Sequence, residues 1–145
     1  MSLNLYKYHT NPETITGFDQ AMDSVPSVAW EHYKGNHEEL RKREHMWAKS
    51  AEHSYWYALF VLKGERFIKG EDAIATDALY SYRYANNVLK GERVEKFEDA
   101  IATSARHSYE YAFFSLNGER FIKGEDAIRG SEYQQAYEQE FGIKL

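Results

Sequence analysis

The sequence predicts an all-α protein: a small α-helical repeat solenoid of 27-residue two-helix units, with degraded capping units at its N- and C-terminal ends. Segments 53–79, 80–106 and 107–133 align without a gap, and thirteen of their 27 positions are identical in all three. Helix-capping residues and glycines recur at fixed places within each segment. Because a single two-helix unit buries little of its own apolar face, neighbouring units are expected to stack and complete one core.

Composition narrows the class of protein. The 145 residues include no cysteine, carry a net charge of −5 and are 16% aromatic, with twelve tyrosines. We expect a single domain, with 1–49 as lead-in and degraded capping repeat, 50–130 as three tandem repeats and 131–145 as a capping helix. The lack of cysteine excludes a disulfide framework, and the negative charge disfavours nucleic acid as a partner. No apolar run is long enough to span a membrane, so we expect a cytoplasmic protein without a membrane partner.

Each unit is expected to begin with a long helix. A helix-capping residue type recurs every 27 positions, at Ser50, Asp77, Ser104 and Ser131. A glycine closes the same pattern, at Gly64, Gly91 and Gly118, where a left-handed conformation stops a helix at little cost. These signals predict helices of about 13 residues that start near Ala51, Ala78 and Ala105.

A shorter second helix is expected after each glycine stop, over 71–74, 98–101 and 125–128. Each begins with a Glu-Asp pair, and the helix dipole favours acidic residues in the first turn. Phe97 stands where the other two copies have glycine, so we expect the middle turn to be built differently.

The two ends carry degraded copies of the unit. Segment 28–50 is interpreted as a degenerate copy of the repeat with a two-residue insertion. In this copy Ala29 and Trp47 occupy the repeat positions of Ala58 and Ile74. After Ser131 we expect a fourth long helix with a polar outer face, since nothing stacks on the last unit. Helix starts are also expected at 11–13 and 24–26, where proline follows a capping residue type.

One side of the long helix is expected to be buried. The residues that share this side are Ser54, Tyr55, Ala58, Val61 and Leu62, with Tyr57 at its edge. Alanine lies at the centre in every copy, which lets helices approach closely. Tyrosines are expected to pack between units, and a tyrosine-lined ligand pocket is the alternative.

A Glu-Arg pair follows each glycine stop, with a lysine three residues after the arginine. In the first unit these residues are Glu65, Arg66 and Lys69. We expect a ladder of ion pairs between successive units. A row of arginines that binds an anionic ligand is the alternative, which the adjacent glutamates disfavour.

The sequence contains no recognisable catalytic or metal-binding motif. Segment 37–41 begins like a zinc-protease helix, but Arg41 stands where the second histidine is required. His53 and His107 share a repeat position that is tyrosine in the middle copy, so we expect both at the surface or its boundary. The prediction is therefore a non-enzymatic protein without catalytic residues, cofactor or metal.

The repeat also resembles a known class of sequence. Its pattern YxYAxxVLKGER at 55–66, followed by GEDAI at 70–74, is similar to a short helical repeat in uncharacterised proteins of large tailed bacteriophages. Segment 5–13 resembles the lead-in of such proteins. The resemblance covers most of the chain and implies an all-helical repeat fold in a phage or bacterial cytosolic setting. It implies no activity.

The repeat positions that vary between copies are expected to lie opposite the buried side. They form the candidate interaction surface: Trp56, Leu59, Phe60, Arg83, Asn86, Asn87, Glu110, Phe113 and Phe114. Large apolar residues on such a face indicate a contact surface for a protein partner, a host component if the phage resemblance holds, or for a second copy of the chain. Two alternatives stay open. The N-terminal segment could cover the face with Tyr6, Tyr8 and Phe18, or aromatic grooves between helices could bind a nucleotide or another small molecule.

Overall fold

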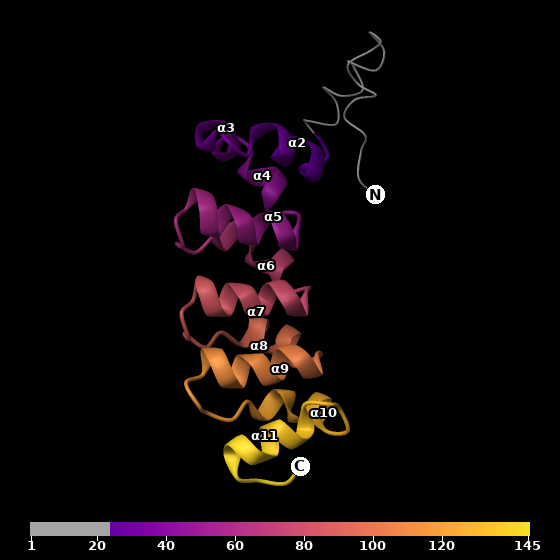
Figure 1. The fold of residues 1–145 in the computed structure, drawn as a ribbon. Coiled ribbons are helices and arrows are strands. Elements are labelled where there is room, and N and C mark those ends of the chain that lie inside the picture. Colours follow the sequence, from indigo (N-terminus) through magenta and orange to yellow (C-terminus); the bar gives the residue numbers. More distant parts are fainter. Residues whose placement is uncertain (1–23) are drawn as a thin grey trace.

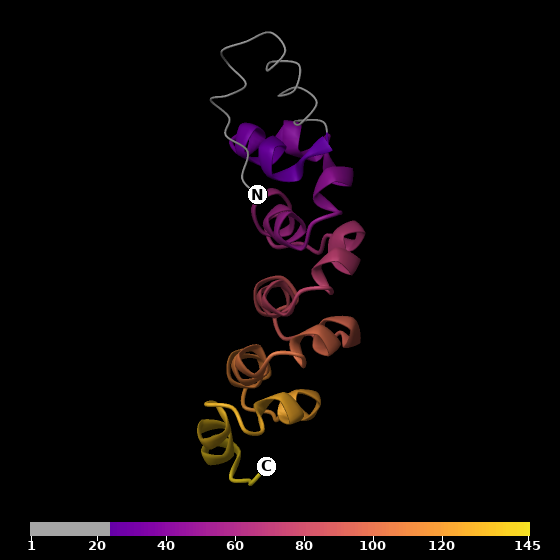
Figure 2. The same ribbon diagram turned by 90° about the vertical axis from the view of Figure 1, so that its right-hand side faces the viewer.

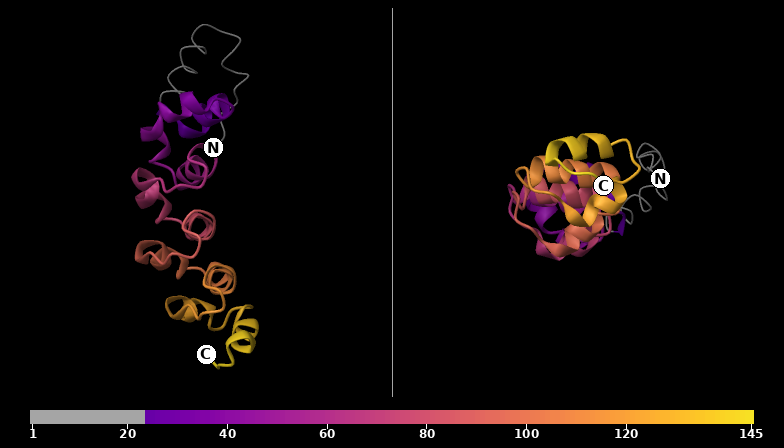
Figure 3. Two further views of the ribbon diagram at one scale, coloured as in Figure 1. Left: turned by 90° about the vertical axis from the view of Figure 1, so that its left-hand side faces the viewer. Right: turned by 90° about the horizontal axis from the view of Figure 1, so that it is seen from below.

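The computed structural model describes residues 24–145, and every regular element in this part of the chain is a helix. Long and short helices alternate and stack one above another (Figure 1). In Figures 2 and 3, α5 (Ala51–Trp56), α7 (Ala78–Asn87) and α9 (Ala105–Glu110) form one layer, here called the long-helix layer. A second, short-helix layer contains α6 (Glu71–Ile74), α8 (Glu95–Ile101) and α10 (Glu125–Ile128). The predicted all-α class is confirmed.

Within the described residues, three short helices precede α5. They are α2 (Pro26–Tyr33), α3 (His37–Arg41) and α4 (Glu44–Trp47). Ala29 and Trp47 are fully buried, as are Ala58 and Ile74, whose places they were predicted to take. α2 begins at the expected proline, with Val25 rather than Ser24 at the cap position. The helix start expected at 11–13 lies outside the described residues.

Three of the four predicted helix caps are present. The side chains of Ser50, Asp77 and Ser104 accept hydrogen bonds from the backbone N–H three residues later, at 3.3, 2.9 and 3.3 Å. The prediction for Ser131 is wrong, because α11 (Gln134–Phe141) starts later and has no side-chain cap. Gly130 stands where the other units have threonine, and its positive φ of 80° produces a different turn. Ser131 instead donates a hydrogen bond to the carbonyl oxygen of Ile128.

The long helices end in a wider turn than an α-helix. α5 continues as the π-helical segment η2 (Tyr57–Val61), and α9 continues as η4 (Tyr111–Ser115). The predicted left-handed glycines are confirmed, with φ of 89°, 90° and 84° at Gly64, Gly91 and Gly118. The residue before each glycine is left-handed too, namely Lys63, Lys90 and Asn117. Two such residues fold the chain back over the helix end. The predicted continuous α-helix is shorter than expected, and two of the three long helices end in a π segment.

The middle unit differs in its short helix, as Phe97 predicts. The outer units have a 3-10 turn, η3 (Ile68–Gly70) or η5 (Ile122–Gly124), ahead of α6 or α10, whereas α8 is one continuous helix. Phe67 packs against Tyr57, with 4.7 Å between ring centroids, and Phe97 packs against Tyr84 at 5.1 Å. Because Phe97 occupies the repeat position of Gly70, the aromatic ring comes from a different position and still lies beside the buried tyrosine.

The core lies between the two layers. Ser54, Ala58 and Val61 are fully buried, as predicted. Tyr57 is fully buried rather than at an edge, and Leu62 at the helix end is only half-buried. The helical wheel assumed one buried side, but the long helices pack against neighbours in their own layer and against the short-helix layer as well. Tyr57 faces the second of these, where it meets Phe67.

Candidate interaction surface

A buried glutamate, paired with a partly exposed arginine of its own unit, joins each of the three repeats to the next unit. Arg66 donates two hydrogen bonds to Glu71, at 2.8 and 2.7 Å, and the Tyr84 hydroxyl of the following unit donates to the same carboxylate at 2.6 Å. Glu71 is 1% exposed. The arrangement recurs further along the chain as Arg93, Glu98 and Tyr111, and as Arg120, Glu125 and Tyr137.

The glutamate and tyrosine of this cluster each keep one protonation state around neutral pH. Burial alone would raise the pKa of the Glu71 carboxyl, but the hydrogen bonds from Arg66 and Tyr84 hold that pKa below its ordinary value. Burial and the adjacent carboxylate raise the pKa of Tyr84, and the same causes raise the pKa of Tyr137 to about 12. The carboxylate stays ionised and the phenol stays protonated. The cluster therefore holds the units in register rather than exchanging protons.

Lysines make further ion pairs between units. Lys96 reaches back to Glu71 and Asp72 at 3.4 Å each, and Lys123 reaches back to Asp99 at 2.7 Å. The predicted ladder is thus present, but most of its acids belong to the short helices. Of the predicted Glu-Arg pairs, Glu119 approaches Arg93 of the preceding unit at 4.0 Å.

All three tryptophans gather around His53. Their ring centroids lie 5.7, 6.0 and 5.3 Å from the imidazole, for Trp30, Trp47 and Trp56 respectively. The prediction that His53 lies at the surface or its boundary is wrong, because it is only 6% exposed. Burial lowers the pKa of this imidazole. The repeat pattern does not predict the burial of His53, because this burial depends on Trp30 and Trp47, which lie outside the well-preserved repeats.

The candidate surface divides into an exposed part and a packed part. Phe60 and Phe114 are 55% and 64% exposed on the long-helix layer, two units apart. Arg83 and Asn87 of the middle unit are also exposed. Asn87 donates a hydrogen bond to the Tyr55 hydroxyl at 2.8 Å, which links α7 to α5.

The remaining predicted surface residues are partly buried. Trp56, Leu59, Asn86, Glu110 and Phe113 share this half-buried environment. Asn86 accepts a hydrogen bond from Ser115 at 3.1 Å, and Glu110 accepts one from Arg106 at 2.7 Å. These side chains therefore contribute to contacts within and between the long helices. The predicted covering segment, with Tyr6, Tyr8 and Phe18, lies outside the described residues.

Sequence reasoning missed two exposed apolar side chains on the short-helix side. Ile68 and Ile122 are 63% and 61% exposed. Both occupy the same repeat position, which is Glu95 in the middle unit. The change from isoleucine to glutamate at this position is the signal in the sequence, and it lies outside the long helix that carries the predicted surface.

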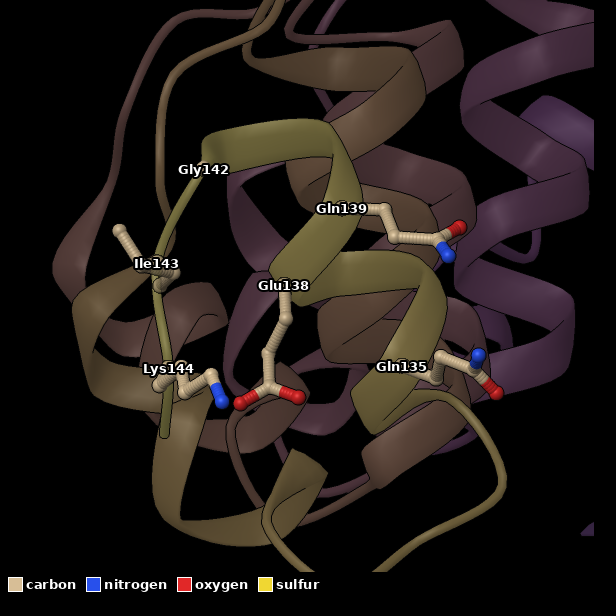
Figure 4. Close-up of a pocket in the computed structure, with 6 residues that line it drawn as sticks. All are labelled: Gln135, Glu138, Gln139, Gly142, Ile143 and Lys144. Carbon is tan, nitrogen blue, oxygen red and sulfur yellow. The ribbon is translucent and has the colours of Figure 1, made fainter.

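A shallow hollow of about 470 Å³ lies at the C-terminal end of the stack. Its lining residues, shown in Figure 4, are Gln135, Glu138, Gln139, Gly142, Ile143 and Lys144. Glu138 accepts a hydrogen bond from the backbone N–H of Leu145 at 2.7 Å, which holds the end of the chain against α11. The lining contains no aromatic side chain and so offers no stacking platform for a planar ligand.

Residues 24–145 show neither a metal-binding cluster nor a membrane-spanning helix. No cluster of three or more histidine, aspartate or glutamate side chains in this range could hold a metal ion. None of its helices has the length and apolar character needed to cross a bilayer. No family model, curated protein or solved structure matches the chain. The exposed residues of the long-helix layer therefore remain the strongest candidate for a functional site.

Proposed function

We propose that the chain is a solenoid of 27-residue two-helix units that acts, without catalysis, as a protein-binding or assembly module. The recurrence of caps, left-handed turns and buried Arg-Glu-Tyr clusters at the same repeat positions supports the solenoid. Stacked units present extended surfaces to other macromolecules. The resemblance to phage repeat proteins makes a bacterial host component the expected partner.

One observation carries this proposal. Phe60 and Phe114 of the long-helix layer expose more than half of their surface. Aromatic side chains suit the centre of an interface, where a partner covers them. A partner that covers α5, α7 and α9 would bury both rings.

The test is the double variant Phe60→Ser/Phe114→Ser. Because both rings are largely exposed, we expect an unchanged circular dichroism spectrum and a change in stability within about 0.5 kcal/mol. Cross-linked partners from a bacterial lysate, identified by mass spectrometry, should be retained by the wild type and lost from this variant. The matched control is Ile68→Ser/Ile122→Ser, which removes two equally exposed residues from the other layer and should keep the partner. Equal retention by both variants would refute the assignment of the surface.

A further inference from the structure

The turn after the third long helix differs in sequence from the first two. A lysine precedes the left-handed glycine in the first two units, at Lys63 and Lys90, whereas Asn117 precedes Gly118 in the third. Asn-Gly occurs once in the sequence, at this place. Both residues are exposed and left-handed, with φ of 51° and 84°. Asparagine differs from lysine in carrying a side-chain carbonyl carbon, Cγ, that the nitrogen of the next residue can attack.

The backbone nitrogen of Gly118 is less restrained than its counterparts. The Gly64 N–H donates a hydrogen bond to the Ala58 carbonyl oxygen at 2.9 Å, and the Gly91 N–H donates to that of Ala85 at 3.4 Å. Among residues 24–145, no group accepts a hydrogen bond from the Gly118 N–H. Because this N–H is exposed and unpaired, hydroxide can remove its proton, which leaves a nucleophilic nitrogen.

The Asn117 side chain is unrestrained as well. Asn36 accepts a hydrogen bond from a backbone N–H at 3.2 Å, and the side chains of Asn86 and Asn87 are bonded to neighbouring long helices. Asn117 forms no side-chain hydrogen bond within the described part of the chain. Apart from the adjoining residues, nothing lies within 4 Å of the place that a Cβ at Gly118 would take, so the space around this glycine is open.

We propose that the Asn117 side chain loses its amide at this turn by spontaneous deamidation. The Gly118 nitrogen, once it has lost its proton, forms a bond to Cγ of Asn117, and the side-chain nitrogen leaves as ammonia. The product is a five-membered succinimide. Water then breaks one of the two ring C–N bonds, which gives aspartate by cleavage at Cγ or isoaspartate by cleavage at the backbone carbonyl carbon. Water is consumed and ammonia is released, with no change in oxidation state.

The left-handed conformation controls the rate of this reaction. A left-handed residue holds the nitrogen of the next residue away from its own side chain, so the ring closes only after rotation about the Asn117 Cα–C bond. That rotation breaks the turn hydrogen bond from the Glu119 N–H to the Leu116 carbonyl oxygen, at 3.1 Å. In the first two units the hydrogen bond of the glycine N–H would have to break as well. The third turn therefore opens most readily, and this opening is local.

The products change the third turn. Isoaspartate lengthens the backbone by a methylene group. Aspartate places a carboxylate beside Glu119 at the end of η4, where the helix dipole disfavours negative charge. The third unit should therefore lose stability as the protein ages. This inference concerns the turn alone and does not rest on the proposed binding role.

The test follows the purified full chain during incubation at pH 8 and 37 °C. Proteolysis at acidic pH and mass spectrometry should show Asn117 converted to aspartate and isoaspartate, while Asn36, Asn86 and Asn87 keep their amides. The rate should rise with pH, because hydroxide generates the nucleophile. If Asn117 keeps its amide, or loses it no faster than the other three, the inference is overturned.

A matched variant tests the structural cause. Lys63→Asn/Asn117→Lys moves the Asn-Gly pair to the first turn, where the Gly64 N–H is hydrogen-bonded. Position 63 should lose its amide more slowly in this variant than position 117 does in the wild type. Equal rates would show that the reaction proceeds through global unfolding and would overturn the assignment to the third turn. During incubation the thermal midpoint should fall for the wild type and stay constant for Asn117→Lys.

Discussion

The exchange between Phe67-Gly70 in the first unit and Val94-Phe97 in the middle unit makes a sharp prediction. A Cβ added at Gly70 would lie 2.6 Å from Cδ2 of Phe67 and 2.6 Å from Cβ of Ser54, so Gly70→Phe alone cannot fit beside the existing ring. Phe67→Val alone would empty a site in which the ring is 3% exposed. The double variant Phe67→Val/Gly70→Phe reproduces the middle unit's pair. It should restore the packing on Tyr57 when segment 68–74 takes the continuous helical form of α8, which moves position 70 away from Ser54.

The magnitudes follow from the size of the side chains. Valine has four fewer side-chain carbons than phenylalanine, so Phe67→Val should cost on the order of 3 kcal/mol at ~0.8 kcal/mol per buried methylene. Gly70→Phe should cost about 3 kcal/mol, at the upper end of overpacking. We expect the double variant to lose clearly less than the sum, with a favourable coupling of about 2 kcal/mol or more.

The assay is a double-mutant cycle by urea unfolding, followed by circular dichroism. The same cycle at Phe121 and Gly124 is a matched replicate, because a Cβ at Gly124 would also lie 2.6 Å from the Phe121 ring. Additive losses at both sites would refute the reasoning, since the two positions would then not share one place in the core.

Three further predictions follow from single sites. Gly91→Ala should destabilise the protein more than Gly118→Ala. Both glycines are left-handed, a conformation that costs alanine about 1–2 kcal/mol. Only the Cβ added at position 91 would also meet a backbone atom, the Ser115 carbonyl oxygen at 3.0 Å. Equal unfolding midpoints for the two would contradict this contact. Ala85→Leu should cost on the order of 1–3 kcal/mol by overpacking a residue that is 2% exposed, and an unchanged thermal midpoint would show that the site has room. Burial lowers the pKa of the His53 imidazole in the folded state, so the unfolded chain binds a proton at this histidine more readily than the folded chain does. The free energy of unfolding should therefore be unaffected by His53 above about pH 6.5 and should fall as the pH drops below that value. Thermal midpoints at pH 7.5 and 5.5 measure the loss, and His53→Phe should show less of it.

The local signals in the sequence were sufficient for three of the four caps, the glycine turns and the altered middle helix. Each of these depends on one or two residues whose conformational preference is strong, such as Asp77 at a cap or Gly91 at a left-handed position. The π segments were not predictable by the same reasoning, because all three units have the same left-handed pair before and at the glycine, yet α7 ends without a π segment.

The buried Arg-Glu-Tyr cluster was missed for a different reason. Glu71 was explained by its place in the first turn of a helix, and that explanation was sufficient without a partner. Its burial depends on Tyr84, thirteen residues further along in the next unit. Invariance at three repeat positions, those of Arg66, Glu71 and Tyr84, was the available signal. A helix dipole favours aspartate as well as glutamate in the first turn, so the dipole alone does not explain an invariant glutamate at this position.

The differences between units are of two kinds, and the distinction bears on function. In the core, the change from Gly70 to Phe97 is accompanied by the change from Phe67 to Val94, so that one ring lies beside the buried tyrosine in either case. At the surface, the change from Ile68 to Glu95 has no such compensation, because the isoleucines are largely exposed. The change from Phe60 to Asn87 is different, since Asn87 donates a hydrogen bond to the Tyr55 hydroxyl. Stability therefore explains the first kind of difference and leaves the second unexplained. We propose that recognition by a partner accounts for the exposed apolar residues that the two outer units carry at such positions.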